Sequence, residues 1–532
     1  MVSSLLVDAL ARPSVLLQDL ANVPDDAQDL PARVSKYFGD IFASDDAFNE
    51  ITQLGLETPP ESLTPRSLVR FDAMVQDTAC SPEIYLSKRS NGECGGWGLN
   101  EHDATDDDQS PVDYNILREC NVIWAVSIPG QSPWSSSQGD LGVAPSTTPA
   151  PSPLSHKYPL PSTTHLGVQM KIYDSTLAEP IRTTDLYSFV GILTSDPWHT
   201  SSETVAPTLV PTIHVLFARQ IASTIVPRAF PASFESPVRE VREHLISWVA
   251  DEALAGDKLA AEWVLLAVMS KVQSRAPPIL PLSLNLTGFG PSTASNPKLT
   301  HVLSQLVPML AVLPLSLNVV NSTTFVPESK DEDLHSGWLQ LPKGSLCIVS
   351  EVSMDEGTVS QKGVYNLRTI QDTMSNQTLD YVFPFSQFSF ETDISFLVLS
   401  AGKKSPFFRT QLQVPLRGSR DTGLYAPDAS LIRLPSPETL SEYRNLIGGG
   451  KIANITLEES TAKFIQDDFV KERQAASSKN AGKTGDVVTS DDLIIRMMVA
   501  KLLAASYHRP EVTREIWEEA KALDERRKAR LD

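Results

Sequence analysis

Five segments in the first half of the chain have the hydrophobic pattern of β-strands. They are short, rich in β-branched and aromatic residues, and bounded by turn-forming residues. The segments are 68–77, 121–128, 166–174, 186–194 and 212–220. Five such strands within about 150 residues predict a small β-barrel, and an OB-like barrel over residues 61–230 is the expected form.

The pattern changes before and between these strands. Residues 1–60 carry short apolar patches at helical spacing and predict an N-terminal helical segment that caps the barrel. Two insertions, the acidic 100–113 and the Pro- and Ser-rich 132–164, contain too little apolar surface to offset chain entropy. We expect both insertions to be disordered loops.

Helical and strand patterns alternate from about residue 235. Val241, Leu245 and Val249 lie on one face of a helix predicted over 236–256, and a more apolar helix begins at about residue 258. Strand patterns that are apolar on both faces follow at 281–288, 313–321, 345–351 and 393–402. Strands of this kind, separated by helices, indicate a largely parallel sheet covered on both faces. We therefore predict an α/β domain over 235–445.

The last segment, 446–532, is predicted to be a helical domain. Ser490 and Thr513 are suitable N-cap residues for two of its helices. The three predicted helices are 455–474, 490–508 and 513–530. The final basic run, Glu525 to Arg530, could contact nucleic acid, but positive charge is also favoured at a solvated helix C-terminus, which is the interpretation we adopt. The expected fold class is an α+β multidomain protein.

Composition favours a protein partner. The chain has 532 residues, 41% hydrophobic and 21% charged, which is typical of a soluble globular protein. Its net charge of −20 would repel a phosphate backbone and disfavours extensive DNA binding. The apolar run 302–320 contains Pro308 and Pro314, so we predict a buried helix followed by a strand and no membrane span.

Cysteine use and the N-terminus indicate a reducing compartment. Four scattered cysteines are too few for a disulfide framework, and they lack the CxxC spacing of a zinc site. They are Cys80, Cys94, Cys120 and Cys347. The first residues, MVSSLLVDALARPS, lack a basic region ahead of a long apolar stretch, so we expect no secretory signal.

The strongest candidate for a phosphate site is Gly256-Asp257-Lys258, directly ahead of an apolar helix. A phosphate-binding loop needs a preceding strand, an earlier glycine, and Ser or Thr after the lysine, whereas Leu259 follows here. Gly256 also suits the left-handed end of one helix, and Asp257 suits the N-cap of the next. We interpret the segment as a helix junction.

Two other glycine and lysine motifs fail the same test. Gly482-Lys483-Thr484 lies in a polar linker without a preceding strand, and in Gly448-Gly449-Gly450-Lys451 the next residue is Ile452. The sequence also lacks the H-E-x-x-H and G-x-S-x-G motifs. It gives no sign of an enzyme, a cofactor or a metal.

Seven collinear segments together resemble one known family, the minichromosome maintenance complex-binding proteins. The resemblance extends in order from about residue 50 to the end of the chain. The segments are SLTPRSLVRFDAMVQD, SIPGQSPW, LYSFVGILTSDP, GDKLAAEWVLLAVMS, LPLSLNLTG, WLQLPKGSLCIVSE and SDDLIIRMMVAKLLAASYHRPEVTREIWEEAKALDERR. It implies a nuclear, non-catalytic partner of the minichromosome maintenance helicase subunits, with roles in helicase assembly or unloading from chromatin and in sister-chromatid cohesion.

The resemblance also implies a degenerate copy of a helicase subunit, with an OB-like barrel, a degenerate AAA-like α/β core and a C-terminal helical lid. Three remnants of a nucleotide site are then expected. The phosphate loop is replaced by Gly256 to Leu259, Ser350 takes the place of the metal-binding Asp ahead of Glu351, and Asp491 takes the place of an arginine that contacts the γ-phosphate. Chromatin association would be indirect, and no membrane or small-molecule partner is expected.

Three alternatives remain open from the residues alone. The chain could be a divergent ATPase that uses Lys483 and Glu351. It could bind single-stranded DNA through barrel aromatics, although their alternation suits core residues equally. These aromatics are Phe71, Trp124, Tyr173 and Tyr187. The acidic segment 101–113 could meet a basic partner surface or could be a solvated loop.

Overall fold

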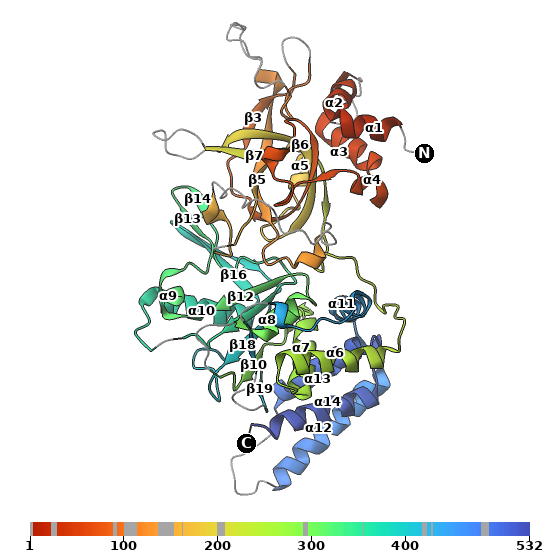
Figure 1. Ribbon diagram of the computed structural model, residues 1–532, viewed down its shortest axis with the longest axis vertical. Helices are drawn as coiled ribbons and strands as arrows, with labels where there is room; N and C mark the ends of the chain where they lie inside the picture. The colour runs from red at the N-terminus through yellow and green to blue at the C-terminus, as the bar shows by residue number, and fades with distance from the viewer. Residues whose placement is uncertain are drawn as a thin grey trace.

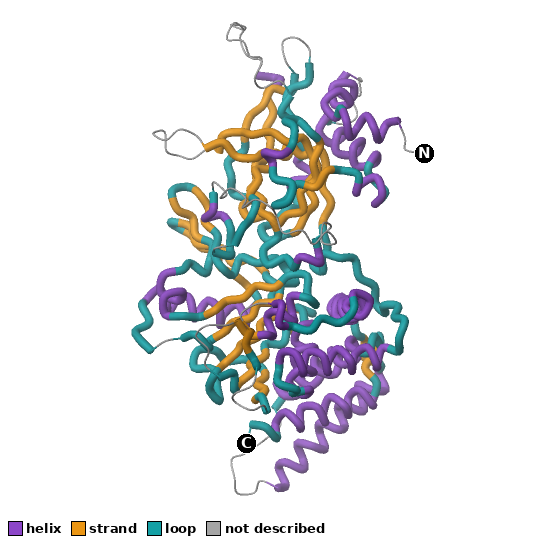
Figure 2. The backbone as a smooth tube through the Cα atoms, in the orientation of Figure 1, coloured by secondary structure: helices purple, strands orange, loops and turns teal. Residues whose placement is uncertain are grey.

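The computed structural model shows a mixed α/β protein built from two stacked units, the barrel unit and the sheet unit (Figure 1). Strands form the centre of each unit and helices lie at the sides (Figure 2). The structure describes residues 4–22, 29–88, 93–99, 114–136, 154–161, 163–198, 208–290, 296–354, 356–417, 423–426, 429–479 and 489–531. The acidic segment 100–113 lies outside these residues.

Five long strands close into the barrel. They are β2 (Leu68–Asp77), β4 (Leu117–Ser127), β5 (Gly167–Ile172), β6 (Leu186–Trp198) and β7 (Thr208–Gln220), and all five predicted strands are confirmed. The pairing runs from β2 through β6, β7, β5 and β4 and returns to β2. Every pair is antiparallel except β5 with β7.

Alternate strand residues fill the barrel because successive side chains of a strand point to opposite faces. Val69 and Phe71 of β2 share one core with Met170, Phe189 and Ile213. Shorter elements complete this unit: β3 (Glu83–Leu86) extends β4, and α5 (Ser175–Ala178) connects β5 with β6.

The N-terminal helices cover one side of the barrel, as predicted. Phe42 stacks on Phe217 of β7 with ring centroids 5.9 Å apart, and Arg219 lies 4.0 Å above the ring of Phe48. The helices are α1 (Ser4–Ala11), α2 (Pro13–Asn22), α3 (Leu30–Ile41) and α4 (Asp45–Asn49). They end before residue 60, since β1 (Thr52–Gln53) already pairs with β2.

The sheet unit contains a five-stranded parallel sheet, which confirms the predicted parallel arrangement. Its strands are β10 (Leu284–Thr287), β12 (Leu310–Pro314), β15 (Leu346–Ser350), β18 (Ser395–Ser400) and β19 (Leu412–Pro415). Their order across the sheet is β12, β15, β18, β10, β19, so the first strand in the chain lies between the last two, β18 and β19.

Helices cover both faces of this sheet. Leu286, Ile348 and Leu397 face a core shared with Trp263, whereas Val349 and other alternate residues face a second core. The first face is covered by α6 (Val238–Ala253), α7 (Lys258–Met269), α8 (Lys298–Ser304) and the C-terminal helices, and the second by α9 (Leu317–Ser322) and α10 (Gln361–Asn376). Strands β15 and β18 are therefore apolar on both sides, whereas β10 alternates leucines with Asn285 and Thr287.

The strand predicted over 313–321 is partly wrong. Strand β12 ends at Pro314, and α9 begins at Leu317. The side chain of Ser316 accepts a hydrogen bond from the backbone N–H of Val319 and so caps the helix. This local cap outweighs the β-propensity of the valines that follow.

A second, smaller sheet joins the sheet unit to the barrel and was not predicted. Its order is β14, β13, β16, β17. The strands are β13 (Glu328–Lys330), β14 (Asp333–His335), β16 (Thr378–Phe383) and β17 (Ser386–Glu391). Further two-residue pairings are β8 (Ser274–Arg275) with β9 (Pro278–Ile279) and β11 (Asn296–Pro297) with β20 (Tyr425–Ala426).

The C-terminal helices pack onto the sheet unit. They are α11 (Pro437–Ile452), α12 (Glu459–Lys479), α13 (Ser490–Ser506) and α14 (Arg514–Lys528), and β21 (Thr456–Leu457) pairs with β22 (Glu511–Val512). The boundary predicted between 445 and 446 falls inside α11. The cap of α13 is Thr489 and not Ser490, whereas Thr513 caps α14 as predicted. None of the helices in the described part of the chain is long and apolar enough to cross a membrane.

Glycines in α11 let the segment between the two units pass close to that helix. A Cβ atom at Gly448 would lie 2.6 Å from the Arg228 side chain, and one at Gly449 would lie 2.7 Å from the Ala229 carbonyl oxygen. Both distances are shorter than real Cβ contacts. The segment after β7 therefore lies directly against a bare helix surface.

The flanks of the Pro- and Ser-rich insertion are ordered, so the prediction of a disordered loop over all of 132–164 is wrong at both ends. Ser132 Oγ donates to the Val307 carbonyl oxygen at 2.7 Å, and the Trp134 indole N–H donates to Ser304 at 2.9 Å. Lys157 on the other flank is fully buried. These polar contacts with the sheet unit hold the flanks in place; residues 137–153 lie outside the described part.

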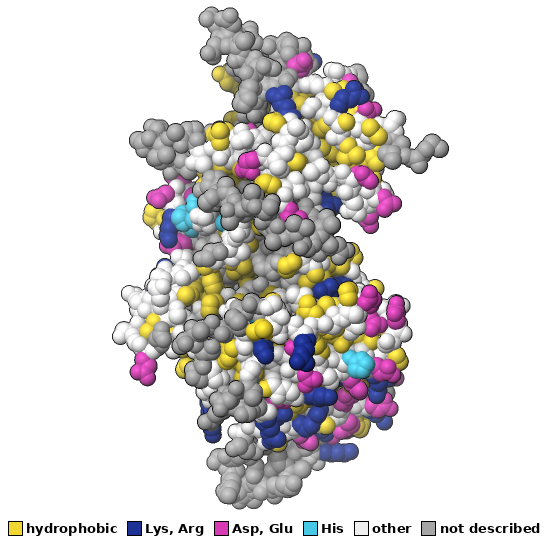
Figure 3. Space-filling view, viewed as in Figure 1, with side chains coloured by type: hydrophobic (Ala, Val, Ile, Leu, Met, Phe, Trp, Pro, Cys, Tyr) yellow, Lys and Arg dark blue, Asp and Glu magenta, His cyan; other side chains and the backbone are white. Residues whose placement is uncertain are grey.

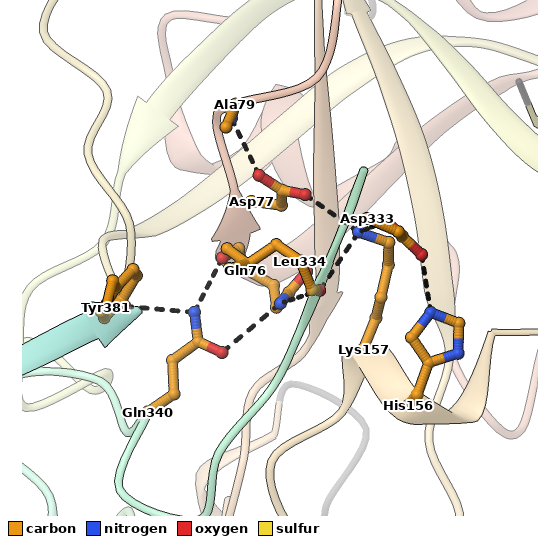
Figure 4. A network of polar contacts seen from close by, with 9 residues as sticks. All are labelled: Gln76, Asp77, Ala79, His156, Lys157, Asp333, Leu334, Gln340 and Tyr381. Atoms are coloured by element: carbon orange, nitrogen blue, oxygen red, sulfur yellow. Dashed lines mark hydrogen bonds and ion pairs between the residues drawn. The ribbon is translucent and has the colours of Figure 1, made fainter. Parts of the chain in front are cut away.

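Lys157 is the centre of a polar network between the two units (Figure 4). Its ammonium lies 2.9 Å from Asp77 at the end of β2 and 2.5 Å from Asp333 in β14. Beside it, Gln340 donates to the Gln76 carbonyl oxygen at 2.8 Å. The two units therefore share ion pairs and hydrogen bonds away from water.

The two carboxylates determine the charge of this lysine. Burial by itself lowers the pKa of Lys157, but the nearby Asp77 and Asp333 outweigh it and raise the pKa above the ordinary value. Burial likewise tends to raise the pKa of Asp333, whereas its contacts with His156 and Lys157 lower it. Both shifts favour the charged forms of Lys157 and Asp333.

Replacing Lys157 with methionine is expected to destabilise the protein strongly. The Lys157→Met variant leaves two buried carboxylates without their shared cation, a change that typically costs about 3–5 kcal/mol. Urea unfolding followed by circular dichroism measures the loss.

The matched control is Lys343→Met. The Lys343 ammonium lies 3.7 Å from Asp185 and its side chain is 43% exposed, so removing it should cost less than about 1 kcal/mol. Equal losses in the two variants would show that the buried triad does not hold the units together.

Candidate functional site at the carboxyl ends of the parallel strands

Polar side chains gather where β10, β15 and β18 run side by side toward their carboxyl ends. Ligands of open parallel sheets bind outside these ends. Asn285 comes from β10, Ser350 and Glu351 from the end of β15, and Ser400 from the end of β18. All four residues are buried.

Glu351 is held by two hydroxyl groups. Ser400 donates to one carboxylate oxygen at 2.7 Å, and Ser405 donates to the other at 2.5 Å. The Ser400 hydroxyl also lies 2.9 Å from the amide oxygen of Asn285. Both carboxylate oxygens of Glu351 therefore already have protein partners.

The environment of Glu351 favours its neutral form. Burial raises the pKa of Glu351, and the hydrogen bonds from Ser405 and Ser400 offset this only in part. The preceding side chain, Ser350, is a buried neutral hydroxyl. The pair offers a single carboxylate whose two oxygens are already hydrogen-bonded, and it is therefore a poor site for magnesium, which prefers carboxylates and water.

The Gly256 segment is the helix junction that the residues predict. Ala255 and Gly256 both have left-handed backbones, with φ of 52° and 82°. Asp257 caps α7 by accepting a hydrogen bond from the Ala260 N–H at 3.1 Å, so the predicted cap is confirmed. Lys258 is exposed.

The element order does not support a phosphate loop at this junction. The segment follows α6, not a strand, whereas a phosphate loop connects a strand to a helix. In the sheet unit, that arrangement is formed by β10 and α8, with Gly288 at φ of 86° directly after the strand. The equivalence of Gly256 to Leu259 with a lost phosphate loop stays a prediction.

The carboxylate of Asp257 is fully engaged with the C-terminus of the chain. Arg530 contacts both carboxylate oxygens, at 2.5 and 3.0 Å, and the Arg417 N–H donates to one of them at 2.9 Å. Burial tends to raise the pKa of Asp257, but Arg530 and the backbone donors lower it overall. The helix junction therefore carries the negative charge of the Asp257 carboxylate at neutral pH.

The terminal basic run is only in part the solvated helix end that we predicted: Arg526 and Lys528 are exposed, but two of its arginines are not. Arg527 is buried, pairs with Asp524 at 2.6 Å and lies 5.8 Å from the ring centroid of Trp263. Arg530 binds Asp257. These arginines attach α14 to the sheet unit and are already paired.

Asp491 lies on α13 and makes no described contact with this edge. It is an exposed residue in the first turn of α13, beside the capping box formed by Thr489 and Asp492. Between described residues, no hydrogen bond or ion pair joins Asp491 to Asp257 or Glu351. An acid at a helix N-terminus is favourable for the helix itself.

The other candidate motifs have structural roles or lie outside the described residues. Gly448 to Lys451 is the end of α11, and the partly buried Lys451 donates to the Gly344 carbonyl oxygen at 2.8 Å. Burial lowers the pKa of Lys451, although Asp393 opposes the shift. The Lys483 motif lies in 480–488, outside the described part.

The barrel aromatics proposed to stack on DNA bases are core residues. Phe71, Trp124, Tyr173 and Tyr187 are each at most 7% exposed. Buried rings cannot form a stacking surface for bases. These four residues therefore give no support to single-stranded DNA binding.

One cluster of potential metal ligands was missed from the sequence. His156, Asp333 and His335 offer ligand atoms that lie within 4.8 Å of one another. Only Asp333-x-His335 was visible as a short motif, because His156 is 177 residues away from Asp333. Their pairing depends on the contact between the two units.

Comparison with known proteins matches the chain to one family over nearly its whole length. The sequence profile described as mini-chromosome maintenance replisome factor matches residues 38–150 and 142–531. The mini-chromosome maintenance complex-binding protein of Gallus gallus is 25% identical, with 99% of this chain and 98% of the relative covered. The protein of that name from Homo sapiens is 24% identical, with 98% of each covered, and the one from Arabidopsis thaliana is 26% identical, with 70% of this chain and 64% of the relative covered.

The Glu351→Gln variant should change how stability depends on pH. Because the folded pKa of Glu351 is raised, its contribution to stability is full below the ordinary value of 4.5 and is lost as the pH rises through the raised pKa. Glutamine does not ionise. The free energy of unfolding of the wild type, relative to the variant, should therefore fall in urea titrations as the pH rises from 4.5 through the raised pKa.

Glu438→Gln serves as the control with the opposite sign. Hydrogen bonds from its own backbone N–H and from Ser436 lower the pKa of Glu438. The wild type should gain stability relative to this variant as the pH rises. If the stability difference changed with pH in the same direction for both variants, burial would not be raising the pKa of Glu351.

Asp257 and Arg530 should be energetically coupled. In a double-mutant cycle with Asp257→Ala and Arg530→Ala, the coupling free energy is expected between about 0.5 and 3 kcal/mol, since the groups contact each other directly. Arg526→Ala is the matched control, because Arg526 is 58% exposed and pairs with Glu262. Effects of Asp257→Ala and Arg530→Ala that simply add would contradict the ion pair.

Proposed function

The chain belongs to the mini-chromosome maintenance replisome factor family, and from this membership we propose that it is a non-catalytic nuclear protein that binds minichromosome maintenance helicase subunits. The observation that carries the proposal is the match over almost the full length of relatives named for binding this complex. A shared fold over the whole chain supports a shared binding surface.

The strand orders support a chain laid out like a helicase subunit. The barrel closes through five strands with a single parallel pair, which suits an OB-like barrel. The parallel sheet carries helices on both faces and has its first strand between the fourth and the fifth, which suits a degenerate AAA-like core. The C-terminal helices would be the lid of that core.

The chemistry of the sheet edge supports the non-catalytic part of the proposal. Asp257 is negatively charged and bound to Arg530, and Ser350 provides no carboxylate next to Glu351. An active site that transfers a phosphoryl group needs cations and a bound metal ion around the phosphates. The described residues at this edge instead satisfy one another.

The proposed biological role is to hold helicase subunits while complexes are assembled or removed from chromatin, with a further role in sister-chromatid cohesion. The net charge of −20 supports contact with chromatin through the helicase and not through DNA. A subunit-like shape supports docking beside a subunit in place of a neighbour.

Affinity purification of the full chain from nuclease-treated nuclear extract tests the proposal. We expect mass spectrometry to identify minichromosome maintenance subunits among the recovered proteins, because the binding surface is part of the folded chain. Nuclease treatment removes proteins that are connected only through DNA.

Two results would contradict the proposal. Recovery of the chain without any helicase subunit would refute the binding function. ATP turnover by the purified chain that is abolished in Glu351→Gln or in Lys483→Ala would refute the non-catalytic part and support the ATPase alternative.

A further inference from the structure

Two histidines and an aspartate meet where the barrel unit contacts the sheet unit. His156 lies in the short helix η4 (Ser155–Lys157), and Asp333 and His335 lie in β14. Across the described residues, this is the group of three His, Cys, Asp or Glu side chains whose ligand atoms come close enough to hold a metal ion. Histidine side chains are visible at the surface beside β13 and β14 (Figure 3).

The backbone orients the three side chains toward one point. Asp333 and His335 are two positions apart on a strand and therefore project from the same face. Asp331 and Glu332 form the two-residue turn before them, with φ of 50° and 62°, as in the tight turns of β-hairpins. The Ser336 N–H donates to the His156 carbonyl oxygen at 2.8 Å and attaches η4 to the end of β14.

The ligand atoms already lie near coordination distance. His156 Nε2 is 2.7 Å from Asp333 Oδ2, and the rings of His156 and His335 have centroids 4.2 Å apart. A tetrahedral zinc ion with bonds of about 2.0–2.1 Å places its ligand atoms roughly 3.4 Å apart. Small side-chain rotations would let an ion replace the hydrogen bond between His156 and Asp333.

The surroundings supply the outer contacts that metal sites need. Lys157 holds Oδ1 of Asp333, which leaves Oδ2 on the side of the histidine. Ligating carboxylates are commonly oriented by such a second contact. A cavity of about 540 Å³ lies alongside, lined in part by Asp77, Asp331 and Asp333, and it gives water and cations access.

We propose that His156, Asp333 and His335 bind one divalent transition-metal ion, with Zn²⁺ the best match to two imidazoles and a carboxylate. Water fills the fourth position from the cavity. Since the ligands come from both units, the bound ion connects η4 to β14 and reinforces their contact. This site does not depend on the proposed helicase binding.

Isothermal titration of the full, chelator-treated chain with zinc chloride tests the site. The wild type should bind one equivalent of Zn²⁺, and the His156→Ala/His335→Ala double variant should bind none. His244→Ala is the matched control, because His244 is an exposed histidine on α6, and it should retain the full stoichiometry.

A second variant and a second measurement separate loss of the ligand from loss of the fold. His335→Gln keeps a polar side chain and should lose Zn²⁺ binding while its circular dichroism spectrum in chelator matches the wild type. Co²⁺ should give visible d–d absorption bands in the wild type and not in His335→Gln. Unchanged Zn²⁺ stoichiometry in folded His335→Gln and in the double variant, or no binding by the wild type, would overturn the proposal.

Discussion

The contact between the two units depends on a fully buried lysine, Lys157, and on the two carboxylates that lie beside it. The Lys157 side chain cannot be charged in the interior unless Asp77 and Asp333 remain beside it. One of these acids belongs to the barrel and the other to the sheet unit. Separating the units would therefore break the ion pairs that Lys157 forms with Asp77 and Asp333. It would also break the hydrogen bonds of Gln76 and Gln340.

The elements that follow from local pattern could be predicted from the sequence, and those that follow from contact could not. Strands β2 and β6 carry enough β-branched and aromatic residues to be recognised, and β15 and β18 are recognised because both of their faces are apolar. Strand β19 has four residues and was not predicted. Strand β14 has three residues and exists because it pairs with β13 at the unit boundary. The helix α9 depends on a single serine cap.

The contacts of the candidate site likewise divide into those that a local sequence pattern predicts and those that only the fold brings together. The cap formed by Asp257 was predictable because an N-cap needs only a residue a few positions from its partner. Its ion pair with Arg530 joins residues 273 positions apart, and no pattern in the sequence marks it. The same holds for Ser405 and Glu351, whose contact exists only once β15 and β18 lie side by side. Chemical interpretation of such motifs therefore depends on partners that only the fold supplies.

The bare surface of α11 has a geometric consequence for the whole molecule. The segment that leaves the barrel lays the side chain of Arg228 across Gly448 and brings the backbone carbonyl of Ala229 directly onto Gly449. A methyl group at Gly449 would overlap that carbonyl oxygen, so the connection between the two units could keep its present path only if the segment or the helix moved.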